Sequence, residues 1–133
     1  MILLDTHAWL WHLAERGSLS DAAREAIDRR EREQRRRAIL ISAISVWELF
    51  MLVKKGRLVL SVPPASFVTA TRRDPVMGIV PVDEAVARRS VELPDYHADP
   101  ADRIILATAA ELGLSVVTRD ARFRRYEAAP VVW

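Results

Sequence analysis

The chain contains no cysteine, which excludes disulfide bridges and thiolate metal sites and fits a protein of the reducing cytoplasm. Its only histidines are too irregularly spaced to form a metal-binding motif; they are His7, His12 and His97. No apolar stretch reaches the roughly 18 residues that a membrane-spanning helix needs, and no basic, signal-like segment precedes the first apolar run. We therefore expect a cytoplasmic protein that has no membrane partner.

Glycine is also scarce, with four residues, and no low-complexity segment indicates a disordered tail. The length of 133 residues, half of them hydrophobic, predicts one compact domain over 1–133. Lysine is rare as well, because all of the 20 basic residues except Lys54 and Lys55 are arginine. Arginine forks suit phosphate contacts, but a high arginine content can also follow from genomic base composition. The net charge of +2 therefore leaves a nucleic-acid partner open.

Apolar segments with the length of buried strands alternate with segments of helical pattern. The expected strands are 2–5, 38–41, 79–82, 114–118 and an edge strand at 130–133. The expected helices are one that Thr6 caps, 21–36 capped by Ser20, 43–55, one from Pro63-Pro64 to 73, one capped by Asp83, and 99–112. This alternation predicts an α/β fold with a mostly parallel central sheet that is flanked by helices on both faces.

Four carboxylates stand where a predicted strand gives way to a helix, or in the first turns of that helix; they are Asp5, Glu48, Asp102 and Asp120. In an open α/β sheet, the carboxyl ends of the strands lie along one edge, and ligands bind there. Such an oxygen-rich, histidine-poor set of side chains suits Mg²⁺ or Mn²⁺. Position alone does not single these acids out, because Asp83 follows a strand in the same way and is interpreted as a plain N-cap.

Glu48 lies in the segment 46–53, which is apolar almost all round and therefore predicts a helix that is buried on most sides. A carboxylate in that setting needs a cation or hydrogen bonds, because an unpaired buried charge is costly. A salt bridge to an arginine is the alternative to a metal site. Ser45, one turn earlier on the same face, is expected to orient Glu48 or a water molecule that it binds.

The segment 99–102 also has the features of a helix start, with Asp99 as N-cap and Pro100 at the first helical position. Asp99 is therefore either a structural cap or a polar support of the site, and Asp102 is the better candidate ligand. A capping role is also open for Asp120, which precedes the segment 121–123.

Four ordered blocks of the chain carry a resemblance to a known family. They are 3–8 (Leu-Leu-Asp-Thr-His-Ala), 41–49 (Ile-Ser-Ala-Ile-Ser-Val-Trp-Glu-Leu), 99–109 (Asp-Pro-Ala-Asp-Arg-Ile-Ile-Leu-Ala-Thr-Ala) and 117–120 (Val-Thr-Arg-Asp). Together these blocks resemble the PIN-domain nucleases, and most closely the VapC-like toxins of bacterial type II toxin–antitoxin pairs. The segment 56–80 matches nothing diagnostic.

The resemblance implies a PIN-like fold and a Mg²⁺-dependent (or Mn²⁺-dependent) endoribonuclease that hydrolyses RNA phosphodiester bonds with a metal-activated water. Carried over position by position, it implies that the metal-binding and catalytic acids are Asp5, Glu48, Asp102 and Asp120. The polar supports that it implies are Thr6, Ser45 and Thr118. It also implies a homodimer and a cognate antitoxin protein that covers the cleft.

Arginines beside these acids are candidates for holding the RNA backbone. The nearest in sequence are Arg103 and Arg119, for which simple balance of the acidic charge is the alternative. Arg122, Arg124 and Arg125 are expected at the rim of the cleft. The run 29–37 interleaves arginine with glutamate and is interpreted as a solvated helix face.

The first helix carries Trp9, Trp11 and His12, which are interpreted as core residues rather than as a partner surface. His7 and His97 are expected near the cleft as hydrogen-bond partners.

Two other functional classes are alternatives to the nuclease. A non-catalytic PIN module would act as an RNA-binding or scaffold protein and would bind RNA without cleaving it. An aspartate-based phosphatase or a receiver domain fits less well, because Asp5-Thr6-His7 lacks a second aspartate and no lysine follows a late strand.

Overall fold

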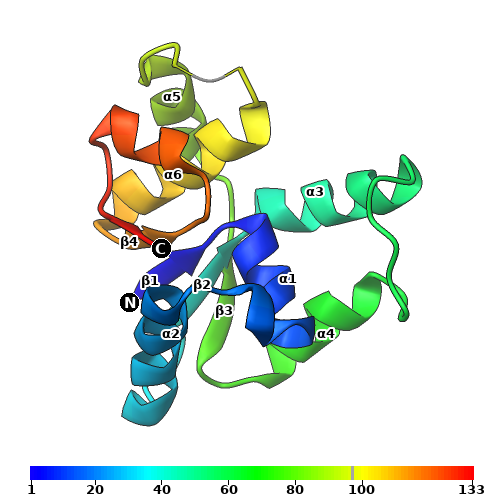
Figure 1. Ribbon diagram of the computed structural model, residues 1–133. Coiled ribbons are helices and arrows are strands. Elements are labelled where there is room, and N and C mark those ends of the chain that lie inside the picture. Colours follow the sequence, from blue (N-terminus) through cyan, green and yellow to red (C-terminus); the bar gives the residue numbers. More distant parts are fainter. Residues whose placement is uncertain (97) are drawn as a thin grey trace.

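The structure is a computed structural model that describes residues 1–96 and 98–133, so the expectation for His97 lies outside the described residues. Five parallel strands form one sheet in the order β3-β2-β1-β4-β5 (Figure 1). Their bounds are β1 Ile2–Leu4, β2 Ile39–Ser42, β3 Met77–Val80, β4 Ser115–Val117 and β5 Val131–Val132. The predicted parallel α/β sheet is confirmed, and its last edge strand is β5.

Helices connect the strands almost as the sequence predicts. Their bounds are α1 Thr6–Ala14, α2 Asp21–Glu33, α3 Ala43–Lys54, α4 Ala65–Arg73, α5 Glu84–Glu92 and α6 Pro100–Leu112, with short 3₁₀ helices η1 Arg16–Ser18 and η2 Ala121–Tyr126. Ser20 caps α2 by accepting a hydrogen bond from the Ala23 amide, and Asp83 caps α5 through the Val86 amide. None of the described helices is both long enough and apolar enough to cross a membrane.

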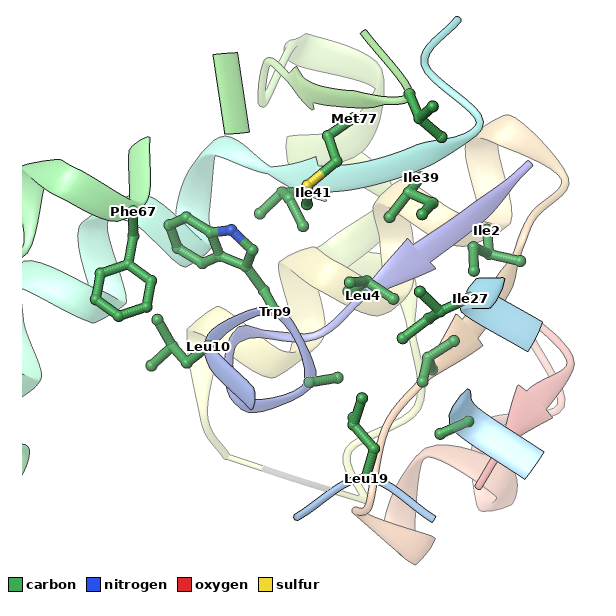
Figure 2. Close-up of a cluster of buried hydrophobic side chains, with 14 of the residues drawn as sticks. Ile2, Leu4, Trp9, Leu10, Leu19, Ile27, Ile39, Ile41, Phe67 and Met77 are labelled. Carbon is green, nitrogen blue, oxygen red and sulfur yellow. The ribbon is translucent and has the colours of Figure 1, made fainter. Parts of the chain in front are cut away.

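The strands are buried on both faces, and alternate residues of each strand point into two separate cores. Ile2, Leu4, Ile39 and Ile41 pack with residues of α1, α2 and α4, as Figure 2 shows for the labelled side chains. Leu3, Leu40 and Val116 pack with residues of α5 and α6 in the second core. Helices therefore cover both faces of the sheet, as predicted.

The largest differences from the expected boundaries are in β3 and α2. Strand β3 begins at Met77 rather than at residue 79, because Gly78 takes a normal place in the ladder opposite Leu40. It ends at Val80 because Pro81 has no amide hydrogen to extend the ladder. Helix α2 ends at Glu33 rather than at residue 36, because Gln34 has a left-handed backbone with φ of 49°.

Helix α3 is far less buried than its apolar sequence suggests. Ser45 and Leu49 are fully buried, but Trp47 and Phe50 are 55% and 44% exposed. The helix projects from the sheet and packs mainly against β2, α1 and α6 (Figure 1). The prediction of a helix buried on most sides was wrong, because a sequence that is apolar all round does not indicate which face is covered.

Candidate active site

The sheet has one point where the chain reverses its direction of winding, and this point lies between β1 and β4. From β1 the chain moves outward through β2 to β3, and it then returns to add β4 and β5 on the other side of β1. The loops that follow β1 and β4 therefore run in opposite directions. At such a switch point, a crevice forms at the carboxyl ends of the two strands. A cleft of about 600 Å³ lies there.

All four acids that the sequence singles out line this cleft. Its described lining residues are Asp5, His7, Trp11, Glu48, Leu52, Asp99, Asp102, Arg119, Asp120 and Arg122. The acids come from the end of β1, the middle of α3, the first turn of α6 and the end of β4, and they converge because parallel strands present their carboxyl ends to one edge.

Asp5 joins the sheet to α1. Its amide donates to the Val117 carbonyl (3.0 Å), which continues the pairing of β1 with β4, and its carboxylate Oδ1 accepts from the Ala8 amide (2.7 Å). Asp5 rather than Thr6 is thus the N-cap of α1, which corrects the predicted cap. Burial raises the pKa of the Asp5 carboxyl, and the hydrogen bonds from the Thr118 hydroxyl and the Ala8 amide oppose this rise.

Asp102 is a second acid of the cleft whose pKa is raised. It lies in the first turn of α6, and partial burial raises the pKa of its carboxyl to about 7. The next contributions come from the negative charges of Asp99 and Glu48, followed by Asp5 and Asp120. The acids are therefore close enough to repel one another, as carboxylates that share a site do.

Asp99 combines both of the roles that the sequence leaves open. Its Oδ1 accepts a hydrogen bond from the Ala101 amide (2.9 Å), which makes Asp99 the N-cap of α6, with Pro100 at the first helical position. It also lines the cleft beside Asp102. The cap holds the carboxylate in place without removing its charge from the site.

Asp120 is paired with the guanidinium of Arg122. Its Oδ1 accepts from the Arg122 amide, which caps η2, and the Arg122 side chain binds both carboxylate oxygens (Nε–Oδ1 2.9 Å, Nη2–Oδ2 2.6 Å). The Asp120 amide donates to the hydroxyl of the buried Thr118 (3.0 Å). Thr118 therefore links Asp5 to Asp120 across the ends of β1 and β4.

Glu48 reaches the cleft from α3 and is half-buried. Ser45 was expected to orient it, but among the described residues the fully buried Ser45 hydroxyl has no hydrogen-bond partner. The hydroxyl of the buried Thr6 is also without a partner in this part of the chain. Buried polar groups normally have hydrogen-bond partners, so these two hydroxyls are available to bind water or a ligand.

Of the two arginines proposed to hold RNA, only Arg119 lies at the cleft, where it is exposed. Arg103 donates to the carbonyl oxygens of Ser90 (3.0 Å), Leu93 (2.6 Å) and Pro94 (2.8 Å), so it binds the end of α5. Arg103 therefore stabilises the end of α5, and its contact with RNA stays a prediction. One step along α6 turns a side chain by about 100°, which moves Arg103 away from the face that carries Asp102.

The first helix contributes His7 and Trp11 to the cleft; His7 was expected there, whereas Trp11 was expected in the core. Trp9 is fully buried and its indole donates to the Thr71 hydroxyl (2.8 Å), as expected of a core residue. Trp11, in contrast, is only half-buried and lies at the cleft, with its ring 5.5 Å from that of His7 and 5.7 Å from that of Trp133. Trp11 follows His7 by four residues and so lies on the same face of the helix, which is the signal that could have located it.

The donor set fits a hydrated divalent cation better than a metal enclosed by protein. Within the described residues, no three Asp, Glu or His side chains are grouped so as to hold one metal ion. Mg²⁺ is usually held by one or two carboxylates while water completes its shell. The raised pKa values of Asp5 and Asp102 and the unpartnered Thr6 hydroxyl are features that a bound cation and its water would relieve.

Comparison with known proteins agrees with this geometry. The family model described as PIN domain matches residues 2–129, so the chain belongs to the PIN-domain family.

Within this family, the chain is similar to a curated protein named Ribonuclease VapC22, from Mycobacterium tuberculosis (strain ATCC 25618 / H37Rv). The two are 37% identical over 136 aligned residues, which cover 99% of this chain and 98% of the relative. Among solved structures, VapBC2 from Rickettsia felis, bound to a DNA fragment from its promoter, has a TM-score of 0.70 at 17% identity and covers 98% of this chain and 97% of its own. FitAcB from Neisseria gonorrhoeae has a TM-score of 0.66 at 24% identity and covers 98% and 96%.

Proposed function

We propose that the protein is a Mg²⁺- or Mn²⁺-dependent endoribonuclease and the toxin of a type II toxin–antitoxin pair. The observation that carries this proposal is the convergence of Asp5, Glu48, Asp102 and Asp120 on one cleft at the switch point of the sheet. The relative named Ribonuclease VapC22, which matches nearly the full length of the chain, supports the same function.

In this proposal, Asp5 and Asp102 hold the cation, Glu48 binds its water molecules, and Asp120 is a fourth acid whose charge Arg122 already balances. A bound Mg²⁺ would polarise a phosphodiester oxygen and lower the pKa of a water molecule for in-line attack. The buried Asp5 is fixed by the Ala8 amide and the Thr118 hydroxyl, so its carboxylate needs no rearrangement when a cation binds.

The chain's own cations then hold the RNA. Arg119 and Arg122 are both exposed at the cleft, and guanidinium groups bind phosphate oxygens in a bidentate manner. Trp11 and His7 line the same cleft with aromatic rings, which suit stacking on an unpaired base.

The partners in this proposal are a cognate antitoxin and a second copy of the chain. An antitoxin is supported by similarity to the solved structures of VapBC from Salmonella typhimurium and of VapBC-5, a member of the VapBC family of toxin–antitoxin systems from Mycobacterium tuberculosis. A homodimer is supported by the exposed Trp47 and Phe50 of α3, since large exposed apolar side chains commonly lie at protein interfaces.

The proposal is tested by incubating the protein with a pool of structured RNA and Mg²⁺. The native protein should cut, and Asp5→Asn and Asp102→Asn should each lose activity by at least about a hundredfold, the lower end of the range for removing one preorganised electrostatic group. Asp83→Asn is the matched control, because Asp83 also follows a strand and caps a helix but lies outside the described lining of the cleft. Asparagine retains the capping oxygen at Asp5 and Asp83 and the approximate size of the side chain at Asp102.

Three results would count against the nuclease. Cutting that persists in both cleft variants indicates a contaminant, and cutting that does not depend on metal excludes the proposed cation. Binding of RNA without cutting, unchanged in Asp5→Asn, would instead support the non-catalytic RNA-binding module.

A further inference from the structure

A second cleft, of about 510 Å³, opens along the edge strand β3 and is lined by arginines. Its described lining residues are Arg36, Arg37, Ala43, Arg72, Asp74, Pro75, Met77, Gly78, Ile79 and Pro81. The two clefts have no described lining residue in common. They approach each other along α3, since Ala43 at the start of this helix borders the second cleft and Glu48 borders the first, about 8 Å further along the axis.

Arg37 is built into this edge rather than free on the surface. Its backbone has a left-handed φ of 55°, and its Nη2 donates to the Ile79 carbonyl of β3 (2.8 Å). The side chain crosses directly over Gly78, where a Cβ atom would lie 2.5 Å from Arg37 Nε. Gly78 therefore allows the guanidinium to lie along the strand edge, and this fixed geometry lowers the entropy cost of binding a ligand there.

Arg36 and Arg72 differ from the arginines of the preceding helix. In α2, Arg30 pairs with Glu33 and Arg32 pairs with Glu25, as expected of a solvated face with both signs of charge. Residues 35–37 lie beyond the end of α2 and leave this pattern, which corrects the prediction for the end of the 29–37 run. Neither Arg36 nor Arg72 has an ion pair or hydrogen bond within the described chain, and both are exposed.

The second cleft keeps most of its positive charge. Asp74 is the one acidic residue among its described lining residues, and its Oδ1 accepts from the Val76 amide (2.8 Å) within the turn that precedes β3. Three guanidinium groups thus face one open cleft with a single opposing carboxylate. Arginine forks match phosphate oxygens in geometry and charge.

We propose that the cleft formed by Arg36, Arg37 and Arg72 binds backbone phosphates of the RNA substrate, upstream or downstream of the cut. This inference rests on the proposed ribonuclease function. Single-stranded RNA is favoured as the ligand because the lining residues follow β3 from Met77 to Pro81, and because α3 borders both this cleft and the acidic cleft. These contacts carry no base information, so they would strengthen the binding of long substrates over short ones.

The test is the binding of a fluorescent single-stranded RNA of about 20 nucleotides to the native protein in chelator, where no metal-dependent cutting occurs. Arg36→Gln/Arg72→Gln removes two charges from the second cleft and leaves the structural Arg37 in place. Arg32→Gln/Arg88→Gln is the matched control, since these exposed arginines pair with Glu25 and Glu92 elsewhere on the surface. Thermal unfolding of both variants should match that of the native protein.

The expected result is a weaker affinity of the first variant and a salt dependence of log Kd that is shallower by about 1.4, because each lost phosphate contact on a single strand removes about 0.7. The control variant should keep the native slope. Equal slopes in the native protein and the first variant, or the same loss in the control, would overturn the proposal. Competition by inorganic phosphate at the same ionic strength, if it abolishes binding, would show a site for free phosphate rather than for RNA.

A cleavage assay separates this inference from the proposed function. With Mg²⁺, Arg36→Gln/Arg72→Gln should lower kcat/KM on the long RNA and leave cleavage of a short oligonucleotide unchanged. If the native protein cuts neither substrate, the nuclease proposal fails, and the salt slopes still decide whether the arginine cleft binds RNA. An equal loss on long and short substrates would contradict a remote backbone contact.

Discussion

The carboxylate of Asp120 and the guanidinium of Arg122 form a bidentate ion pair at the acidic cleft, with an Nη2–Oδ2 distance of 2.6 Å. Burial and like charges raise the pKa of Asp102 and of Asp5, whereas Asp120 already has a cation beside it. We therefore infer that Asp120 acts mainly by holding Arg122 at the cleft.

Arg122→Gln and Asp120→Asn should each lower kcat/KM for RNA cleavage by about tenfold to a hundredfold, which is the worth of a charge-assisted hydrogen bond. The double variant should have the same kcat/KM as the less active of the two single variants, because the two side chains act as a unit. Arg124→Gln is the control, since Arg124 is exposed on η2 and lies outside the described lining of the cleft. Losses that multiply in the double variant would instead give Asp120 an independent role as a metal ligand.

Without metal, the stability of the protein should fall as the pH rises through the range in which Asp102 ionises. The pKa of Asp102 is about 7 in the folded state, against 3.8 for a freely solvated aspartate, so the folded state holds the proton more tightly. Between these values the unfolded state binds fewer protons, and the free energy of unfolding decreases with pH. In the native protein the decrease in the free energy of unfolding that Asp102 contributes should be on the order of 3 kcal/mol, and it should be absent from Asp102→Asn. Denaturant unfolding in chelator at pH 4.5 and 8 measures the difference, and native and variant curves with the same pH trend would contradict it.

Mg²⁺ or Mn²⁺ should raise the melting temperature of the native protein by several degrees, because a ligand that binds only the folded state stabilises it. The double variant Asp5→Asn/Asp102→Asn should show almost no shift, since the two acids that hold the cation are neutral. Differential scanning fluorimetry over a metal titration provides the measurement, with Asp83→Asn as a control that keeps the native shift. The same shift in the double variant would place the cation elsewhere.

The sequence predicted the sheet and the meeting of the acids for the same physical reason. Buried strands of β-branched and leucine residues are recognisable by their length, and strands that alternate with helices run parallel. Parallel strands bring their carboxyl ends to one edge, so residues as far apart as Asp5, Glu48 and Asp102 line one cleft. Neither step requires knowledge of side-chain direction.

Side-chain direction explains what the sequence could not predict. Arg103 adjoins Asp102 in sequence but turns to the end of α5, and Trp11 turns to the cleft while Trp9 enters the core. The exposure of α3 was missed because its apolar residues surround the helix and define no buried face. The arginine cleft was missed because the left-handed Gln34 ends α2 before residues 35–37.

His12 provides a second titration, remote from the acids of the cleft. It is buried between α1 and α2, with Nδ1 3.1 Å from Arg16 Nη1 and Nε2 3.6 Å from Glu31 Oε1. Burial, followed by the positive charge of Arg16, lowers the pKa of the imidazole from 6.5 to about 4. The folded state therefore contains neutral His12 throughout this interval.

The contribution of His12 to the free energy of unfolding should decrease as the pH falls from 6.5 to 4, because the unfolded chain takes up the proton first. The loss that His12 contributes is on the order of 3 kcal/mol. Its sign is opposite to that of the Asp102 contribution, so the native protein alone does not separate the two. Because the two contributions oppose each other between pH 4.5 and 6.5, the native protein should change little in denaturant unfolding over this range. His12→Gln should instead lose stability as the pH rises, because only the Asp102 contribution remains. The same pH trend in both proteins would show that His12 does not titrate in this interval.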